Sequence, residues 1–144
     1  MALKMRFLYY SGKAKMKAVA EAVKAEFDLA QNFNAIDIIP PAYSCANERL
    51  VILAISGKGE PDDMLRRFCY ELDKKKAQNV AILVDGDERM GEGLTKIIKE
   101  TGTNLVGEVK YVKLGGLPFI GGALKDAEKA DILGWAHGIV NNIQ

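Results

Sequence analysis

Three short and almost unbroken apolar runs constrain the fold of this chain more than any other feature of its sequence. They cover residues 5–10, 49–55 and 79–84. Runs of this length without alternation are typical of strands that are covered on both faces in a parallel sheet. Each run is followed by a turn and then by a segment with helical periodicity. This alternation predicts a parallel sheet with right-handed crossovers and helices on both faces.

The segments between the runs have the pattern of amphipathic helices. In the first of them, Met16, Val19 and Val23 fall on one face, which indicates the side that packs on the sheet. Lysines near the end of the second segment are expected at the carboxyl end of a helix. The helices are expected over residues 13–27, 61–76, 91–102 and 123–141.

Two weaker strands complete the predicted sheet. Residues 34–39 form one, stopped by Pro40, and residues 105–114 form the other, with a partial alternation that suits a sheet edge. Residues 40–48 leave little room for a crossover helix, so a tight loop or a single helical turn is expected there. The result is a single domain over residues 1–144, an α/β three-layer fold whose doubly wound five-stranded parallel sheet has the order 2-1-3-4-5.

Composition argues against several functional classes. Hydrophobic residues make up 49% and charged residues 27% of the chain, with a formal net charge of +1, so no general field favours nucleic acid or an anionic membrane. No apolar run approaches the roughly 20 residues that span a bilayer, and nothing resembles a signal peptide. We therefore expect a cytoplasmic protein that binds neither nucleic acid nor membrane.

Cysteine and histidine offer little for catalysis or metal binding. Cys45 and Cys69 lack metal-ligand spacing, and Cys69 falls on the apolar face of its helix, where a buried thiol is expected. His137 is the only histidine, and a lone histidine on a helix is more often a surface group than a catalyst. Function should be sought elsewhere, and the sequence leaves open whether the chain is an enzyme.

The doubly wound order points to three loops. In this architecture ligands bind beyond the carboxyl ends of the strands, where the strand order reverses. The loops that meet there cover residues 11–16, 56–61 and 85–91. The first leads directly into a helix, and free N–H groups at the start of a helix favour an anion such as phosphate.

Over nearly its whole length the chain resembles the flavodoxins. The resemblance is carried by its length, its order of elements, the Tyr-x-Ser-Gly turn at residues 9–12, and the segments 50–61 and 80–93. In that family the first loop wraps the phosphate of FMN, and the next two loops sandwich its isoalloxazine ring. The resemblance thus implies FMN as cofactor and a redox protein as partner. The implied cofactor-binding residues are Ser11, Gly12, Lys13, Ala14, Lys15, Met16, Ser56, Gly57, Lys58, Gly59, Asp85, Gly86 and Asp87.

The first loop departs from the family pattern. Of the expected hydroxyl groups only that of Ser11 is present, and Lys13, Ala14, Lys15 and Met16 stand where the family typically has Thr, Gly, Asn and Thr. The two lysines can attract phosphate as point charges, without the directional fit of a hydroxyl cradle. Alternatively, they only solvate the start of the helix, where cations oppose the dipole.

The other two loops also depart from the pattern, because neither carries an aromatic ring to stack on a flavin. Met90 is the only large apolar residue of the third loop, and Asp85 and Asp87 add negative charge that opposes an anionic reduced flavin. The alternative role of these aspartates is to form a turn and cap the next helix. An aromatic wall would have to come from Tyr10 or from Phe119, which could instead pack its own loop onto the body.

Two functional hypotheses follow. The first is an FMN-binding electron carrier or reductase-like protein, in which the redox chemistry belongs to the flavin. The second is a flavodoxin-like domain that has lost FMN and acts as a binding or assembly module. The layout and the loop lysines favour the first, which is our working hypothesis, and the missing hydroxyls and aromatic rings favour the second. The sequence does not indicate the oligomeric state.

Overall fold

A computed structural model of the protein describes residues 4–11, 14–29, 33–35, 48–114 and 124–143. Strands and helices alternate along most of this chain, as the apolar runs predict. The elements are β1 (Met5–Tyr10), α1 (Ala14–Phe27), β2 (Phe33–Ala35), β3 (Leu50–Gly57), α2 (Asp63–Glu71), β4 (Asn79–Gly86), α3 (Glu88–Glu100), β5 (Asn104–Leu105), β6 (Lys110–Val112) and α4 (Asp126–Ile143).

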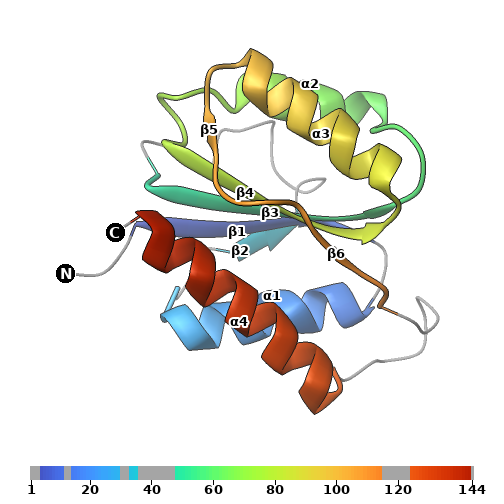
Figure 1. The fold of residues 1–144 in the computed structure, drawn as a ribbon, viewed down its shortest axis with the longest axis vertical. Helices are drawn as coiled ribbons and strands as arrows, with labels where there is room; N and C mark the ends of the chain where they lie inside the picture. Colours follow the sequence, from blue (N-terminus) through green and yellow to red (C-terminus); the bar gives the residue numbers. More distant parts are fainter. Residues whose placement is uncertain (1–3, 12–13, 30–32, 36–47, 115–123, 144) are drawn as a thin grey trace.

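All strand pairs of the described sheet are parallel, and the strand order is β2-β1-β3-β4-β5, with β6 also paired to β4. This confirms the doubly wound order expected from the sequence. Figure 1 shows three layers, with α2 and α3 on one face of the sheet and α1 and α4 on the other. The crossovers therefore leave the carboxyl ends of the strands at one edge of the molecule.

Each face of the sheet has its own core. Because successive side chains of a strand point to opposite faces, Val51 and Leu53 of β3 pack with α2 and α3, whereas Ile52 and Ala54 pack with α1 and α4. All four side chains are fully buried. Burial on both faces explains why this strand is an unbroken apolar run in the sequence.

The fifth strand is interrupted. The sequence predicts one strand over residues 105–114, whereas the structure has two short strands on the same side of β4. β5 pairs with Asn79 and Val80, and β6 pairs with residues 83–85. Between them Gly107 has a φ of +69°, a backbone conformation that glycine adopts readily and other residues rarely. The expectation of a continuous strand was therefore wrong at this point.

Helix α3 begins earlier than the sequence pattern predicts. Its first residue is Glu88, and Asp87 is the N-cap, because its Oδ1 accepts a hydrogen bond from the backbone N–H of Met90 at 3.2 Å. The predicted cap is confirmed. Met90 and Gly91, which the sequence placed in the third loop, belong to the helix.

Helix α2 begins at Asp63, slightly later than expected from Pro61. Asp62 is its N-cap, and the Oδ1 of that residue accepts a hydrogen bond from the backbone N–H of Leu65 at 2.9 Å. Pro61 therefore precedes the cap and does not form the first turn. In this position its ring packs against Gly93 of α3.

Several expectations concern residues outside the described part of the chain. These include residues 36–39 of the predicted second strand, the loop over residues 40–47, Cys45, and the glycine-rich segment around Phe119. They stay predictions from the sequence.

Candidate functional site

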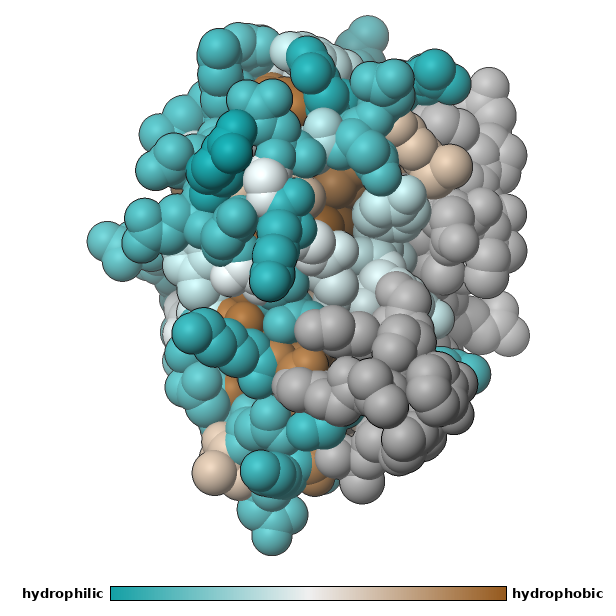
Figure 2. Space-filling view, turned by 90° about the vertical axis from the view of Figure 1, so that its right-hand side faces the viewer, coloured by the Kyte–Doolittle hydropathy of each residue, from teal (hydrophilic) through white to brown (hydrophobic). Residues whose placement is uncertain are grey.

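The carboxyl ends of β1, β3 and β4 lie side by side at one edge of the sheet. This edge is on the right in Figure 1 and faces the viewer in Figure 2, where hydrophilic side chains cover most of the described surface. The parallel register places Ser56 beside Asp85 and Gly57 beside Gly86, and Ser11 follows β1 directly. The fold thus brings together residues from all three predicted loops. We call this place the strand-end crevice.

A chain of polar side chains crosses the strand-end crevice. The hydroxyl of Ser11 donates to Oγ of Ser56 at 2.7 Å, and the hydroxyl of Ser56 donates to Oδ2 of Asp85 at 2.9 Å. The backbone N–H of Leu114 donates to Oδ1 of the same carboxylate at 2.9 Å. Asp85 is only 5% exposed. Since both of its oxygens accept hydrogen bonds, this buried carboxylate joins the strand ends to the segment that follows β6.

A second carboxylate joins the second loop to the third. The backbone N–H of Gly59 lies 3.1 Å from each carboxylate oxygen of Asp87. The pKa of Asp87 is held below its ordinary value of 3.8, first by this N–H group and then by the N–H of Met90 and the charge of Arg89, against an opposing effect of burial. We call this contact the Gly59–Asp87 tether.

The strand ends beneath the tether are packed tightly. A Cβ atom at Gly86 would overlap the carbonyl oxygen of Gly57. A Cβ at Gly57 would lie 3.0 Å from the methyl carbon of Met90, whose side chain is nearly buried. Glycine at both positions therefore allows β3 and β4 to stay paired up to their last residues.

Tyr10 makes another contact across the crevice. Its hydroxyl donates to Oδ2 of Asp62 at 2.8 Å, while Oδ1 of Asp62 caps α2. The ring of Tyr10 packs against the core on the side of α2 and α3. The aromatic residue that the sequence offered as a wall for a flavin thus links the end of β1 to the start of α2.

The first loop is described only in part. Gly12 and Lys13 lie outside the described residues, and Ala14 is the first residue of α1. The Nζ of Lys15 lies 3.4 Å from Oε1 of Glu128 on α4. The side chain of Met16 is fully buried in the core, which leaves only its backbone for a ligand.

The described residues contain neither a group of potential metal ligands nor a helix that could span a membrane. In the ranges given above, no three His, Cys, Asp or Glu side chains are grouped so that they could hold a metal ion. None of the described helices combines the length and the apolar character that crossing a membrane requires.

Comparisons with known proteins identify the fold. No family model matches the chain, and no curated protein matches it. Among solved structures, it is similar to a flavodoxin-like domain of a Synechococcus sp. protein, with 12% identity and a TM-score of 0.56 over 93% of this chain and 99% of that one. It is also similar to rubredoxin:oxygen oxidoreductase of Desulfovibrio gigas, with 9% identity and a TM-score of 0.58. The chain has a flavodoxin-like fold. The second match covers 99% of this chain but only 36% of the oxidoreductase.

The flavodoxin-like fold makes FMN the cofactor to test against the crevice, and the ring position does not fit. A ring in contact with two loops needs them to be about 7 Å apart, because each carbon contact takes about 3.5 Å. The Gly59–Asp87 tether joins the same two loops at one point, where the N–H of Gly59 lies 3.1 Å from the carboxylate of Asp87, so a ring at that point would require the tether to open. The carboxylates of Asp62, Asp85 and Asp87 also line these loops, so an anionic ring would meet like charge.

The phosphate end of an FMN site fits better. The first turn of α1 contains no acidic residue and starts at the end of β1. Lys15 in that turn carries a positive charge, although Glu128 already lies beside it. In this flavodoxin-like fold the described residues therefore place a lysine in the first turn of α1 and a hydrogen bond between the two loops that would flank a planar ring.

The sequence missed two participants in the crevice. Asp62 was not among the residues expected at the site, although an aspartate before a helix is a strong cap signal. Its bond to Tyr10 spans 52 residues, and the bond from Leu114 to Asp85 spans 29. Contacts at such separations have no local pattern that could reveal them.

Proposed function

We propose that this chain is a flavodoxin-like binding or assembly domain that does not hold FMN in its strand-end crevice. The observation that carries the proposal is the Gly59–Asp87 tether, which joins the loops that would sandwich the ring. For this function and for the alternative below, we propose the cytoplasm as the compartment, on the basis of composition and cysteine usage.

The energetics of the tether support this reading. Opening the tether to admit a ring would break the contact of the Gly59 N–H with both oxygens of Asp87 and would therefore weaken FMN binding. Neither loop offers an aromatic side chain whose stacking would offset this loss. Electrostatic repulsion from Asp85 and Asp87 would add to it.

An FMN-binding electron carrier with a protein redox partner is the second candidate. The start of α1 favours it, because Lys15 and the N–H groups in the first turn of a helix without early acidic residues suit a phosphate. The flavin would supply the redox chemistry when bound. In that case Lys13→Ala combined with Lys15→Ala should weaken FMN binding and make it less sensitive to salt.

Titration with FMN, followed by the quenching of flavin fluorescence, separates the two candidates. We expect no quenching with the wild-type protein at micromolar FMN. Saturable quenching would overturn the proposal and support the electron carrier.

The variant Asp87→Ser tests whether the Gly59–Asp87 tether is what keeps FMN out of the crevice. Serine retains the cap of α3, but it lacks the carboxylate that bonds Gly59. If the tether excludes the ring, this variant should bind FMN more tightly than the wild type. Equal binding by both proteins would remove the tether as the explanation. Glu71→Gln, which alters an exposed carboxylate on α2, is the control.

A further inference from the structure

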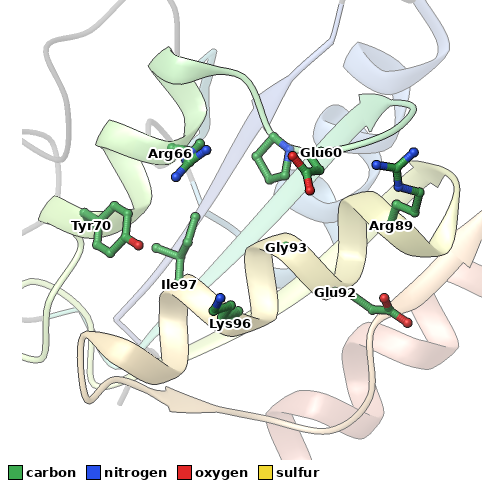
Figure 3. Close-up of a pocket in the computed structure, with 9 residues that line it drawn as sticks. Glu60, Arg66, Tyr70, Arg89, Glu92, Gly93, Lys96 and Ile97 are labelled. Atoms are coloured by element: carbon green, nitrogen blue, oxygen red, sulfur yellow. The ribbon is translucent and has the colours of Figure 1, made fainter.

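A cleft lies between α2 and α3, on the outer side of these helices and away from the polar chain of the strand-end crevice. Its volume is about 290 Å³, close to the lower limit of about 300 Å³ that is usual for small-molecule sites. Figure 3 shows Arg66 and Tyr70 on α2 and Lys96 and Ile97 on α3, on the two sides of the cleft. No part of the crevice described above uses these four residues.

One end of the cleft is closed by a specific packing contact. A Cβ at Gly93 would lie 2.6 Å from Cδ of Pro61, so only glycine lets the proline ring rest on α3. This contact brings the loop that precedes α2 down onto α3. Ile97 is 5% exposed and gives the cleft an apolar floor. The cleft is therefore formed by packing of the backbone as well as by flexible surface side chains.

Among the described residues, the basic side chains of the cleft form no close ion pair, although the charge of Arg89 acts on Asp87. Arg66, Arg89 and Lys96 line it, and in the part of the chain that the structure describes none of the three forms an ion pair within 4.0 Å. By contrast, Lys110 pairs with Asp131 at 2.8 Å. With three cationic and two anionic side chains in its lining, the cleft has a net positive charge, which favours an anionic ligand.

Charge is distributed unevenly along the cleft. In Figure 3, Arg66 and Lys96 lie toward the end occupied by Tyr70, Arg89 and Glu92 lie toward the other end, and Glu60 lies between Arg66 and Arg89. The hydroxyl of Tyr70, which is 47% exposed, donates to Oε2 of Glu100 at 2.9 Å, and Arg66 lies on the same helix beside it. A ligand that suits both ends carries an anionic group at one end and hydrogen-bond donors at the other.

We propose that the cleft between α2 and α3 binds a small phosphorylated sugar-sized metabolite, with its phosphate at Arg66 and Lys96 and its hydroxyl groups toward Glu60 and Glu92. The guanidinium of Arg66 can bond two phosphate oxygens at once, and Lys96 adds a point charge. Carboxylates near Arg89 accept hydrogen bonds from sugar hydroxyls. The apolar faces of Ile97 and Pro61 contact the sugar ring. This inference does not depend on whether FMN binds in the crevice.

The test is a titration of the ¹⁵N-labelled protein with glucose 6-phosphate, followed by amide chemical shifts. We expect saturable shifts over residues 66–70 and 93–97. Glucose and inorganic phosphate, each of which has only half of the required chemistry, should bind at least about tenfold more weakly. If inorganic phosphate binds as well as the sugar phosphate, or if no shift saturates, the proposal is overturned.

Matched variants locate the site. Arg66→Gln combined with Lys96→Gln should weaken binding of glucose 6-phosphate by at least about tenfold, because both phosphate contacts are lost. Arg67→Gln combined with Lys99→Gln removes the same charge from exposed positions of the same helices outside the cleft. An equal loss in this control pair would mean that general charge attraction explains the binding, and would contradict the site. All the substituted residues are exposed, and circular dichroism verifies that each variant is folded.

Discussion

Asp85 and Asp87 lie two residues apart at the end of β4 and bind different parts of the crevice. The carboxylate of Asp85 is buried and accepts hydrogen bonds from Ser56 and Leu114. That of Asp87 accepts from the backbone of Gly59 and of Met90. One aspartate thus joins the strand ends, and the other joins two loops and a helix start.

The lowered pKa of Asp87 predicts how stability depends on pH. A carboxyl group whose pKa is lower in the folded than in the unfolded state stabilises the fold above its unfolded pKa, here near 3.8, and the stabilisation is lost as pH falls through the folded pKa. Asp87→Asn keeps an oxygen acceptor but removes the charge. At neutral pH we expect the free energy of unfolding, measured with urea, to be higher for the wild type than for this variant. Below pH 3.8 we expect this difference to decrease toward zero.

The control for this measurement is Glu71→Gln, at an exposed position on α2. It should not reproduce the change seen with Asp87→Asn. A difference between wild type and Asp87→Asn that stays constant down to the most acidic pH would contradict the assignment of charge stabilisation to Asp87.

For single residues, the sequence predicted a helix cap, which is a local contact, but not the Gly59–Asp87 tether, which joins distant segments. Asp87 was expected to cap a helix, and it does, because the cap depends on residues three positions apart. The bond from Gly59 to Asp87 joins residues 28 positions apart. Its formation depends on the register of β3 with β4, which no single stretch of sequence specifies.

Among the elements, the fifth strand and α3 depart most from the pattern in the sequence. The apolar residues of 105–114 suggested one strand, yet Gly107 takes a positive φ and divides it. An isolated glycine inside a strand pattern is itself a signal for a bulge or a close approach. The start of α3 was misplaced because Gly91 looked like part of a loop, whereas it serves as a contact point within the helix.

That contact gives a prediction for α3 and β6. A Cβ at Gly91 would overlap the phenol oxygen of Tyr111 and lie 2.8 Å from its Cζ. Because Tyr111 is 39% exposed, its ring can turn aside, and Gly91→Ala should lower the free energy of unfolding by about 0.5–1.5 kcal/mol, the cost of moving a side chain off its rotamer, although alanine favours helix. In a Tyr111→Leu background the same substitution should be neutral or stabilising by up to about 1 kcal/mol. Urea unfolding of the four proteins measures this double-mutant cycle.

Gly134→Ala in α4 is the matched control. Nothing lies within 4 Å of a Cβ at that position, so alanine should stabilise the protein by up to about 1 kcal/mol through its helix propensity. An equal cost of Gly91→Ala with and without Tyr111 would show that the ring is not the cause.

For the molecule as a whole, the sequence predicted the layers and the strand order but not the state of the crevice. Buried parallel strands leave a clear pattern, because both faces of β1, β3 and β4 must be apolar. The crevice depends on polar contacts between distant segments, such as Tyr10 with Asp62. Such contacts decide whether the strand-end loops are open to a ring or joined to each other.

Because Cys69 lies in the core between the sheet and the helices α2 and α3, its thiol is a probe of global unfolding. Its side chain is fully buried among β3, α2 and α3, and burial raises its pKa to about 12. In a Cys45→Ser background we expect dithionitrobenzoate to leave the native protein unmodified. Labelling should appear with urea along the same transition as the circular dichroism. Rapid labelling of the native protein would mean that α2 opens independently of the rest.

The interruption at Gly107 has a consequence for association between molecules. The outer side of β4 is lined by a strand of two residues and a strand of three, separated by a left-handed turn. A strand from another copy that approached this edge would meet a strand of two residues or a strand of three. Short, broken edges are a common protection against edge-to-edge pairing and fibril growth. A continuous strand here would bury the same apolar residues but would offer a template for aggregation.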